Sequence, residues 1–310
     1  MKGLELSRTY YERCAKEEIA RQFGAYEDRI ASGLVGFGSE CFGYDDEISV
    51  DHDFGPRFFL FLTDEDEAEI GFELARFYRA LPNEFNGIQL AAESRFGAVG
   101  GGVMKIGDFY RQFTGSEGVP KTWEQWLSIP EASLACAVNG EVFCDPLGTF
   151  SAIRETLQRG YPEDCRRKKL AAAAIMMAQS GQYNYSRCRR HGEHGAAQLA
   201  LAEFVQAASS AIFLLNRRYK PYYKWVFRSM EKLPVLAEQK QELEALLMSY
   251  GEDDLSENIE RICTAIVGEI KWQGLSDGNW TYLEPHAIAI RNSIENREIR
   301  SLHIMDGYSS

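Results

Sequence analysis

The segment GFGSECFGYDDEISVDHDFGPRFFLFL, from Gly36 to Leu62, carries the features that indicate the fold. It joins a glycine-serine turn to an acidic stretch and then to a strongly apolar run. If residues 51–62 form a strand, Asp51 and Asp53 share one face and His52 lies on the other. Two neighbouring carboxylates repel each other, and a bound divalent cation relieves that repulsion. The segment therefore predicts a strand-turn-strand unit with an Mg²⁺ site at Asp51 and Asp53.

The glycine-serine turn has its own chemistry. Gly38 and Ser39 follow a short apolar segment that we expect to be a strand. Such a turn offers backbone N–H groups and a hydroxyl to a phosphate. A turn of this kind beside a metal site would hold a nucleoside triphosphate by its phosphates and align one of its oxygens for in-line attack.

The bulk composition narrows the class of protein. The chain has 310 residues, of which 45% are hydrophobic and 26% are charged, as in a soluble globular protein. Its formal net charge of -12 argues against a general nucleic-acid binder and favours a small or cationic partner over long nucleic acid. Seven cysteines without paired spacing argue against a disulfide framework and favour a reducing cytoplasm. The charged N-terminal stretch predicts an amphipathic helix rather than a signal peptide, and no apolar run is long enough to predict a membrane span.

The element pattern changes near residue 150. The first half alternates helical and extended patterns, with a helix expected over Glu65–Leu81 and a strand over Val103–Ile106. Asn139-Gly140 predicts the turn of a β-hairpin. Beyond Phe150 the apolar residues recur almost exclusively with helical spacing. We therefore expect an α+β protein, with an α/β domain at 1–149 followed by an all-helical bundle at 150–310.

The motifs resemble a known superfamily. Gly38-Ser39 followed by Asp51-His52-Asp53 resembles the signature of the polymerase-beta-like nucleotidyltransferases. The wider run GSECFGYDDEISVDHDFGPR is similar to a poorly characterised bacterial family of that superfamily, first catalogued as a domain of unknown function. Two later segments, QYNYSRC (Gln182–Cys188) and NRRYKPYYKW (Asn216–Trp225), are also similar to that family, so the resemblance extends to about Pro234.

This resemblance implies a mixed sheet with flanking helices and a specific activity. Asp51 and Asp53 would be the catalytic Mg²⁺ ligands, and Gly38 and Ser39 would contact the nucleotide triphosphate. The enzyme would transfer a nucleoside monophosphate, with ATP as the expected donor, to an acceptor hydroxyl and release pyrophosphate. The acceptor stays open between a small molecule, a protein hydroxyl and an RNA end.

Many members of the superfamily use a third carboxylate on a later strand. The segment GGVMKIGDF, where we would expect it, has no acid before Asp108. Five carboxylates remain as unranked candidates: Glu93, Asp108, Glu131, Glu141 and Asp145. For Asp145, which precedes Pro146, a structural turn is the favoured role. If none of the five reaches the metal, the chain is a slow enzyme or binds a nucleotide without transferring it.

A second constellation lies in NRRYKPYYKW, which holds four cations and four aromatic residues. The cations can bind phosphate, and the aromatic rings can stack on a base or sugar. Lys220, Tyr223 and Lys224 are therefore candidate nucleotide contacts. The alternative is a helix-helix corner whose rings pack in the core while the charged ends extend outward.

The segment GQYNYSRCRRHGEH supplies two further candidates. By resemblance, Asn184 and Arg187 would face a cleft between the two halves, near the acceptor or the triphosphate. The alternative is an interhelical loop with solvated arginines. His191 and His194 do not predict a metal site, because no second ligand pair accompanies them.

Two functions of other classes stay open beside the transferase. One is a degenerate nucleotide sensor that keeps the fold without transfer activity. The other is a protein-interaction module in which the aromatic and basic corner at 216–225 is the contact surface.

Overall fold

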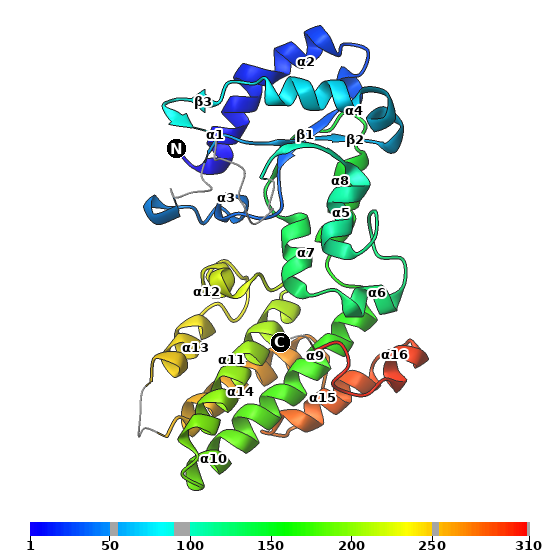
Figure 1. The fold of residues 1–310 in the computed structure, drawn as a ribbon. Coiled ribbons are helices and arrows are strands. Elements are labelled where there is room, and N and C mark those ends of the chain that lie inside the picture. Colours follow the sequence, from blue (N-terminus) through cyan, green and yellow to red (C-terminus); the bar gives the residue numbers. More distant parts are fainter. Residues whose placement is uncertain (50–54, 90–99, 250–253, 309–310) are drawn as a thin grey trace. The chain divides into compact units, whose positions relative to one another are not determined.

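The computed structural model describes residues 1–49, 55–89, 100–249 and 254–308 (Figure 1). Close contacts divide the chain into two compact units, which are described separately. Unit 1 comprises residues 1–120 and 133–159, and unit 2 comprises residues 121–132 and 160–310. This division differs from the expected one at 149/150, because the helix that begins at Thr149 belongs to unit 1 and a short segment before residue 133 belongs to unit 2.

Unit 1 combines a small mixed sheet with helices, as expected for its α+β class. Its elements in chain order are α1 (Gly3–Tyr10), the π-helical turn η1 (Tyr11–Ala15), α2 (Lys16–Gln22), η2 (Glu27–Arg29), β1 (Ala31–Leu34), α3 (Ser39–Phe42), η3 (Glu47–Ser49), β2 (Phe59–Leu62), α4 (Asp64–Arg79), β3 (Glu84–Phe85), β4 (Ile88–Gln89), β5 (Gly102–Lys105), α5 (Ile106–Thr114), β6 (Glu141–Cys144) and α8 (Thr149–Gln158). Helix α7 (Glu131–Val138) begins at the end of the unit 2 segment and continues into unit 1.

The main sheet has the strand order β5-β2-β1-β6. Strand β1 pairs antiparallel with both β2 and β6, whereas β2 pairs parallel with β5. The sequence of β2 is FLFL, and all four residues are buried. A continuous apolar run of this kind is what a strand with both faces covered requires.

Helices cover both faces of β2 (Figure 1). On one face, Leu60 and Leu62 belong to the same buried cluster as Tyr10, Tyr11 and Leu74, which come from the N-terminal helices and α4. On the other face, the ring of Phe61 stacks on that of Phe150 at 4.4 Å and contacts that of Phe109 at 5.3 Å. Contact between Phe61 and Phe150 explains why α8 belongs to unit 1, because the phenylalanine of α8 completes the core beneath the sheet.

Two expectations for this unit were wrong in detail. The strand expected over 51–62 is confirmed only at Phe59–Leu62, since residues 55–58 are not extended strand and 51–54 lie outside the described residues. The hairpin expected around Asn139-Gly140 does not form either. The residues before this turn form α7 rather than a strand, and only the residues after it form β6. The strand β6 therefore pairs with β1, about 110 residues earlier in the chain, instead of with its sequence neighbour.

The described residues of unit 2 form helices joined by turns and loops, without a strand, as the sequence predicts. Its elements are α6 (Trp123–Ser128), α9 (Glu163–Met177), the π-helical segment η4 (Ala178–Tyr185), α10 (Ser186–Arg190), α11 (His194–Leu215), η5 (Tyr223–Trp225), α12 (Val226–Met230), α13 (Gln239–Met248), α14 (Ser256–Trp272), α15 (Leu283–Asn292) and α16 (Arg297–Ser301).

The core of unit 2 lies where α9 packs against α11 and α15. Small residues make this close packing possible, because Ala171, Ala172 and Ala174 of α9 are fully buried. Helix α11 is long and apolar enough to cross a membrane by length and composition, but 67% of its apolar window is buried within the protein. A buried core helix passes the same test of length and composition as a membrane span, so α11 is weak evidence for a membrane protein.

Candidate functional site

The Gly-Ser turn is the best-described part of the predicted site. It begins directly after β1, and its two glycines, Gly36 and Gly38, have φ angles of 98° and 122°. Only glycine adopts such angles at little cost. Ser39 is the first residue of α3. The spacing of the glycines therefore follows from a sharp reversal of the chain between β1 and α3.

A residue from far along the chain holds this turn in place. The side chain of Asn139 accepts a hydrogen bond from the Gly36 N–H at 2.8 Å and donates one to the Gly36 carbonyl at 2.7 Å. The Gly140 N–H donates to the Cys41 carbonyl at 2.7 Å, on the other side of the turn. Arg154 of α8 donates to the carbonyls of both Asn139 and Gly140. Asn139-Gly140 is thus a support for the Gly-Ser turn, a role that its hairpin-like sequence does not reveal.

A buried ion pair lies at the same turn. Glu40 is 6% exposed, and its carboxylate is bound by the guanidinium of Arg57. The Ser39 hydroxyl lies 3.4 Å from the other Glu40 oxygen. Glu40 and Arg57 were both missed by the sequence reasoning, because the acidic stretch and the segment GPRFF show no sign that these two charges would meet.

The predicted metal ligands Asp51 and Asp53 lie outside the described residues. Two acids of the preceding stretch are described, and both have structural partners. Asp45 is buried and accepts a hydrogen bond from the Gly3 N–H at 2.8 Å, while Asp46 accepts one from the Ile48 N–H at 3.1 Å. Among the described residues, no group of three or more His, Cys, Asp or Glu is arranged to hold a metal ion.

Two candidates for the third carboxylate are bound to arginines in unit 1. Asp108, on α5, forms ion pairs with Arg111 and Lys105. Glu141, on β6, is bound by Arg8 of α1. The Glu141 pair joins β6 to α1, whereas the Asp108 pairs are local to the start of α5.

The other candidates differ in their surroundings. Asp145 follows β6 and accepts a hydrogen bond at 2.7 Å from the Ser151 N–H in the first turn of α8, which is the structural role favoured from the sequence. Glu131 is buried in unit 2, where its carboxylate accepts a long hydrogen bond from the Lys220 N–H. Glu93 lies outside the described residues.

The candidates Asn184 and Arg187 are both exposed. Asn184 lies in the π-helical segment η4, a geometry that often occurs at functional sites. Arg187 donates to the Tyr183 hydroxyl at 2.6 Å, and its guanidinium lies 5.6 Å from the centre of that ring. Their neighbour Gln182 instead holds the bundle together through Glu260 and the Leu283 N–H.

The aromatic and basic segment at 216–225 divides into a buried part and an exposed part. Tyr219 is buried, and its ring meets that of Tyr161 edge to face at 5.0 Å. Tyr222 and Tyr223 are exposed, with ring centres 4.2 Å apart. Tyr219 therefore packs in the core, as expected if the segment is only a helix-helix corner. Tyr222 and Tyr223, in contrast, expose their rings to solvent.

The charges of this segment divide in the same way. Lys220 is 8% exposed, and its ammonium donates to the Gln206 backbone carbonyl at 3.4 Å. In contrast, the exposed Lys224 and Arg228 lie 5.6 and 5.5 Å from the centre of the Trp225 ring. Lys224 and Tyr223 are therefore available to a ligand, whereas Lys220 is part of the core.

Lys220 belongs to a buried group of charges that the sequence analysis did not anticipate. Lys169 of α9 is 2% exposed, donates to the Gly307 carbonyl at 3.0 Å and lies over the ring of Tyr161. Burial lowers the pKa of both lysines, and the nearby Glu131 carboxylate partly offsets that effect. Burial also raises the pKa of Glu131, and the two lysines oppose it. Four consecutive cations, as in the run RRKK of α9, are typical of a solvated surface, but Arg166, Lys168 and Lys169 are all buried.

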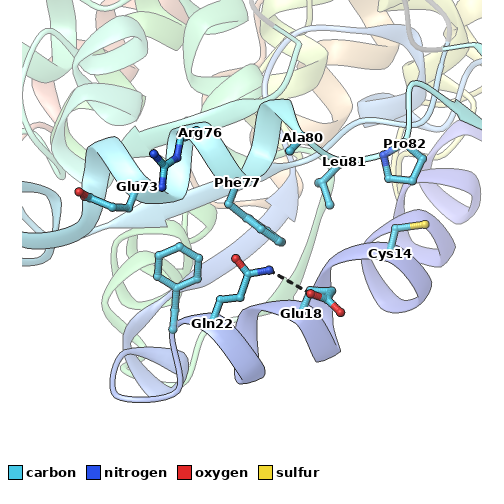
Figure 2. A pocket seen from close by; sticks show the side chains of 10 residues that line it. Cys14, Glu18, Gln22, Glu73, Arg76, Phe77, Ala80, Leu81 and Pro82 are labelled. Carbon is cyan, nitrogen blue, oxygen red and sulfur yellow. Dashed lines mark hydrogen bonds between the residues drawn. The ribbon is translucent and has the colours of Figure 1, made fainter.

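A groove of about 570 Å³ lies on unit 1 between the N-terminal helices and α4 (Figure 2). Phe77 and Leu81 give it apolar surface, and Glu18, Glu73 and Arg76 give it charge. Among the described residues, none of those predicted as site residues lines this groove. The groove and the Gly-Ser turn are therefore separate features of unit 1.

Comparison with protein families finds a match for part of the chain. Residues 126–226, about a third of the chain, match a family described as "Domain of unknown function (DUF4037)". The matched segment includes QYNYSRC, NRRYKPYYKW and the Asn139-Gly140 turn, but not the Gly-Ser turn or the two aspartates. No curated protein and no solved structure matches the chain.

Proposed function

We propose that this chain is an Mg²⁺-dependent nucleotidyltransferase of the cytoplasm that transfers a nucleoside monophosphate from a nucleoside triphosphate to an acceptor hydroxyl. The observation that supports it is the Gly-Ser turn. Gly38 has a positive φ angle in the turn between the buried strand β1 and α3, and β1 pairs with β2, the strand that follows Asp51 and Asp53 in sequence.

The proposed roles follow the chemistry of the residues. Gly38 and Ser39 contact the triphosphate, and Asp51 and Asp53 supply the hard oxygen ligands that Mg²⁺ prefers. When bound, the metal would neutralise charge that develops on the phosphoryl oxygens. The exposed side chains of Asn184, Arg187, Tyr223 and Lys224 remain candidate contacts for the nucleotide or acceptor. Lys220 is left out of the nucleotide site because of its burial.

One observation favours a nucleotide-binding protein without transfer activity as the second candidate. Asp108, Glu141 and Asp145 each already bind an arginine or a backbone N–H. If these contacts persist in the complex, none of the three is free to act as a general base for the acceptor hydroxyl.

The proposal is tested by thermal shift with each of the four nucleoside triphosphates, with and without Mg²⁺. A stabilisation that requires Mg²⁺ is expected for the donor nucleotide, because a ligand that binds the folded state raises the melting temperature. The variant Asp51→Asn/Asp53→Asn should keep the fold and lose this shift.

The matched control is Asp64→Asn/Glu65→Gln, which removes two exposed carboxylates from the start of α4 and should keep the shift. An equal shift in the Asp51/Asp53 variant would refute the metal site. An assay of pyrophosphate release then distinguishes the two candidate functions, because only a transferase releases pyrophosphate from the bound nucleotide.

A further inference from the structure

The Gly-Ser turn is already in contact with an anion, and that anion belongs to the protein itself. The Glu40 carboxylate packs so closely on Gly38 that a Cβ built at this glycine would lie 2.7 Å from one carboxylate oxygen. That same oxygen lies 3.4 Å from the Ser39 hydroxyl. An internal carboxylate therefore occupies the immediate surroundings of Gly38 and Ser39.

The cation that balances this carboxylate is Arg57. Its guanidinium binds the second Glu40 oxygen, and its side chain is only 15% exposed. A Cβ built at Gly100 would lie 2.5 Å from an Arg57 nitrogen, so this glycine leaves room for the guanidinium. The Arg57 backbone N–H also donates to the Ser7 hydroxyl at 3.3 Å. Arg57 is thus held beside the turn by its surroundings as well as by Glu40.

A guanidinium, a hydroxyl and a glycine that lets an anion approach the backbone closely are also the groups that recognise a phosphate. Arginine binds carboxylates and phosphates through the same paired N–H donors. A phosphate carries more charge and more acceptor oxygens than a carboxylate. A phosphoryl group that reaches Arg57 would therefore compete with Glu40 for the same donors.

We propose that Ser39 and Arg57 form a phosphate subsite at the Gly-Ser turn, and that the Glu40 carboxylate occupies it as a built-in competitor. The inference rests on the proposed function for the source of the phosphate, which is the triphosphate of a nucleotide. Arg57 is then a ligand-binding residue, and Glu40 sets how strongly an anion must bind to displace it.

The test is a calorimetric titration with inorganic tripolyphosphate, without metal and at low salt. Glu40→Gln should bind tripolyphosphate about tenfold more tightly than the wild type, because the competing charge is gone while Arg57 remains. Arg57→Gln should bind about tenfold more weakly or not at all. A purely structural ion pair predicts no such opposite effects, since either change breaks the same pair.

Matched controls come from another ion pair of unit 1. Asp66 is 1% exposed and is bound by Arg29 at 2.8 Å. Asp66→Asn and Arg29→Gln break a carboxylate-arginine pair between α4 and η2 and should leave tripolyphosphate affinity unchanged. If Arg57→Gln does not fold, Arg57→Lys keeps the charge without the paired donors and should weaken binding by a smaller factor.

The outcomes separate this inference from the proposed function. Equal affinities of the wild type and Glu40→Gln, or no binding by either, would overturn the subsite. Opposite effects of the Glu40 and Arg57 variants on tripolyphosphate, without any Mg²⁺-nucleotide shift, would support the subsite and refute the transferase. If the nucleotide raises the melting temperature only when Asp51 and Asp53 are present, but the Glu40 and Arg57 variants do not have opposite effects on tripolyphosphate, the proposed function would be supported and the subsite refuted.

Discussion

The side chain of Asn139 bonds to both the N–H and the carbonyl of Gly36, 103 residues earlier in the chain. An amide side chain that pairs with a backbone in this way replaces two hydrogen bonds that a neighbouring strand would otherwise make. It fixes the chain just before Gly38 and Ser39. The geometry of the proposed phosphate site therefore depends on Asn139, which lies two residues before β6.

Asn139→Ala should therefore affect both stability and binding. We expect a loss of about 2 kcal/mol in the free energy of unfolding, measured with urea, from two hydrogen bonds. The Mg²⁺-nucleotide shift should also decrease, because the turn is no longer held.

Asn216→Ala is the matched control for this change. In unit 2, the Asn216 side chain likewise donates to and accepts from the backbone at Val235. Its loss should destabilise the protein by a similar amount while nucleotide affinity of the folded protein stays unchanged. If both variants bind nucleotide like the wild type, Asn139 does not position the site.

A pair of lysine variants distinguishes the core from the exposed part of the segment at 216–225. Lys220→Met leaves Glu131 buried with one fewer cation, and we expect a loss of about 3 kcal/mol in stability. Lys224→Met removes an exposed cation over Trp225 and should cost about 0.5 kcal/mol, while weakening nucleotide binding under the proposed function. The reverse pattern in urea unfolding and titration would place Lys220 in the nucleotide site after all.

Acid should destabilise the protein through Glu163. Hydrogen bonds from Arg166, assisted by Arg167 and Arg217, lower the pKa of this carboxyl from its usual 4.5 to about 2. The folded-state pKa is below the unfolded one, so its contribution is complete above about pH 4.5 and is lost as the pH falls towards 2. Because the carboxylate is partly exposed, solvent screening limits this contribution to about 1 kcal/mol.

Urea unfolding of the wild type and of Glu163→Gln between pH 6 and pH 3 measures the stability that the ionised Glu163 carboxylate contributes. The variant should be less stable at pH 6, and the difference should shrink towards pH 3. A difference that does not vary with pH would show that charge pairing of Glu163 contributes nothing.

Replacing either of two helical glycines of unit 2 by alanine should change the stability of the protein, in opposite directions. At Gly181, a Cβ would lie 2.3 Å from the Phe204 ring and 3.0 Å from Ile259, so Gly181→Ala should destabilise the protein by about 2 kcal/mol. At Gly268, within α14, an added Cβ would have no atom of the described residues within 4 Å apart from its chain neighbours and the backbone of its own helix, so Gly268→Ala should stabilise the protein by about 0.5–1 kcal/mol. Thermal melting of the two variants measures both signs, and a stabilising Gly181→Ala would contradict the packing of η4 against α11.

Several elements were accessible from the sequence because their signals are local. The apolar run in β2, the helical spacing of α4 and the strand β5 are confirmed at Phe59–Leu62, Asp64–Arg79 and Gly102–Lys105. The helical second half is confirmed as well. In each case, the spacing of apolar residues matches the repeat of the element itself.

Other features were inaccessible because a distant residue decides them. Asn139-Gly140 has the local signal of a hairpin, yet α7 precedes it and its partners are Gly36 and Cys41. Gly100 and Gly101 look like part of a flexible loop, but they leave space for Arg57 and for the hydroxyl of Tyr78.

By itself, the sequence determined the α+β class, the order of the main elements and the turn at Gly38-Ser39. These features depend on residues close together in sequence, because glycine favours the backbone angles of a turn and the spacing of apolar residues matches the repeat of a helix or strand. Only the tertiary structure decided which charges meet. Glu40 faces Arg57 at the turn, and Lys169 and Lys220 lie beside Glu131 within the bundle. The physical reason is that an ion pair depends on distances between elements, which packing of the apolar core sets and which no local pattern of charges encodes.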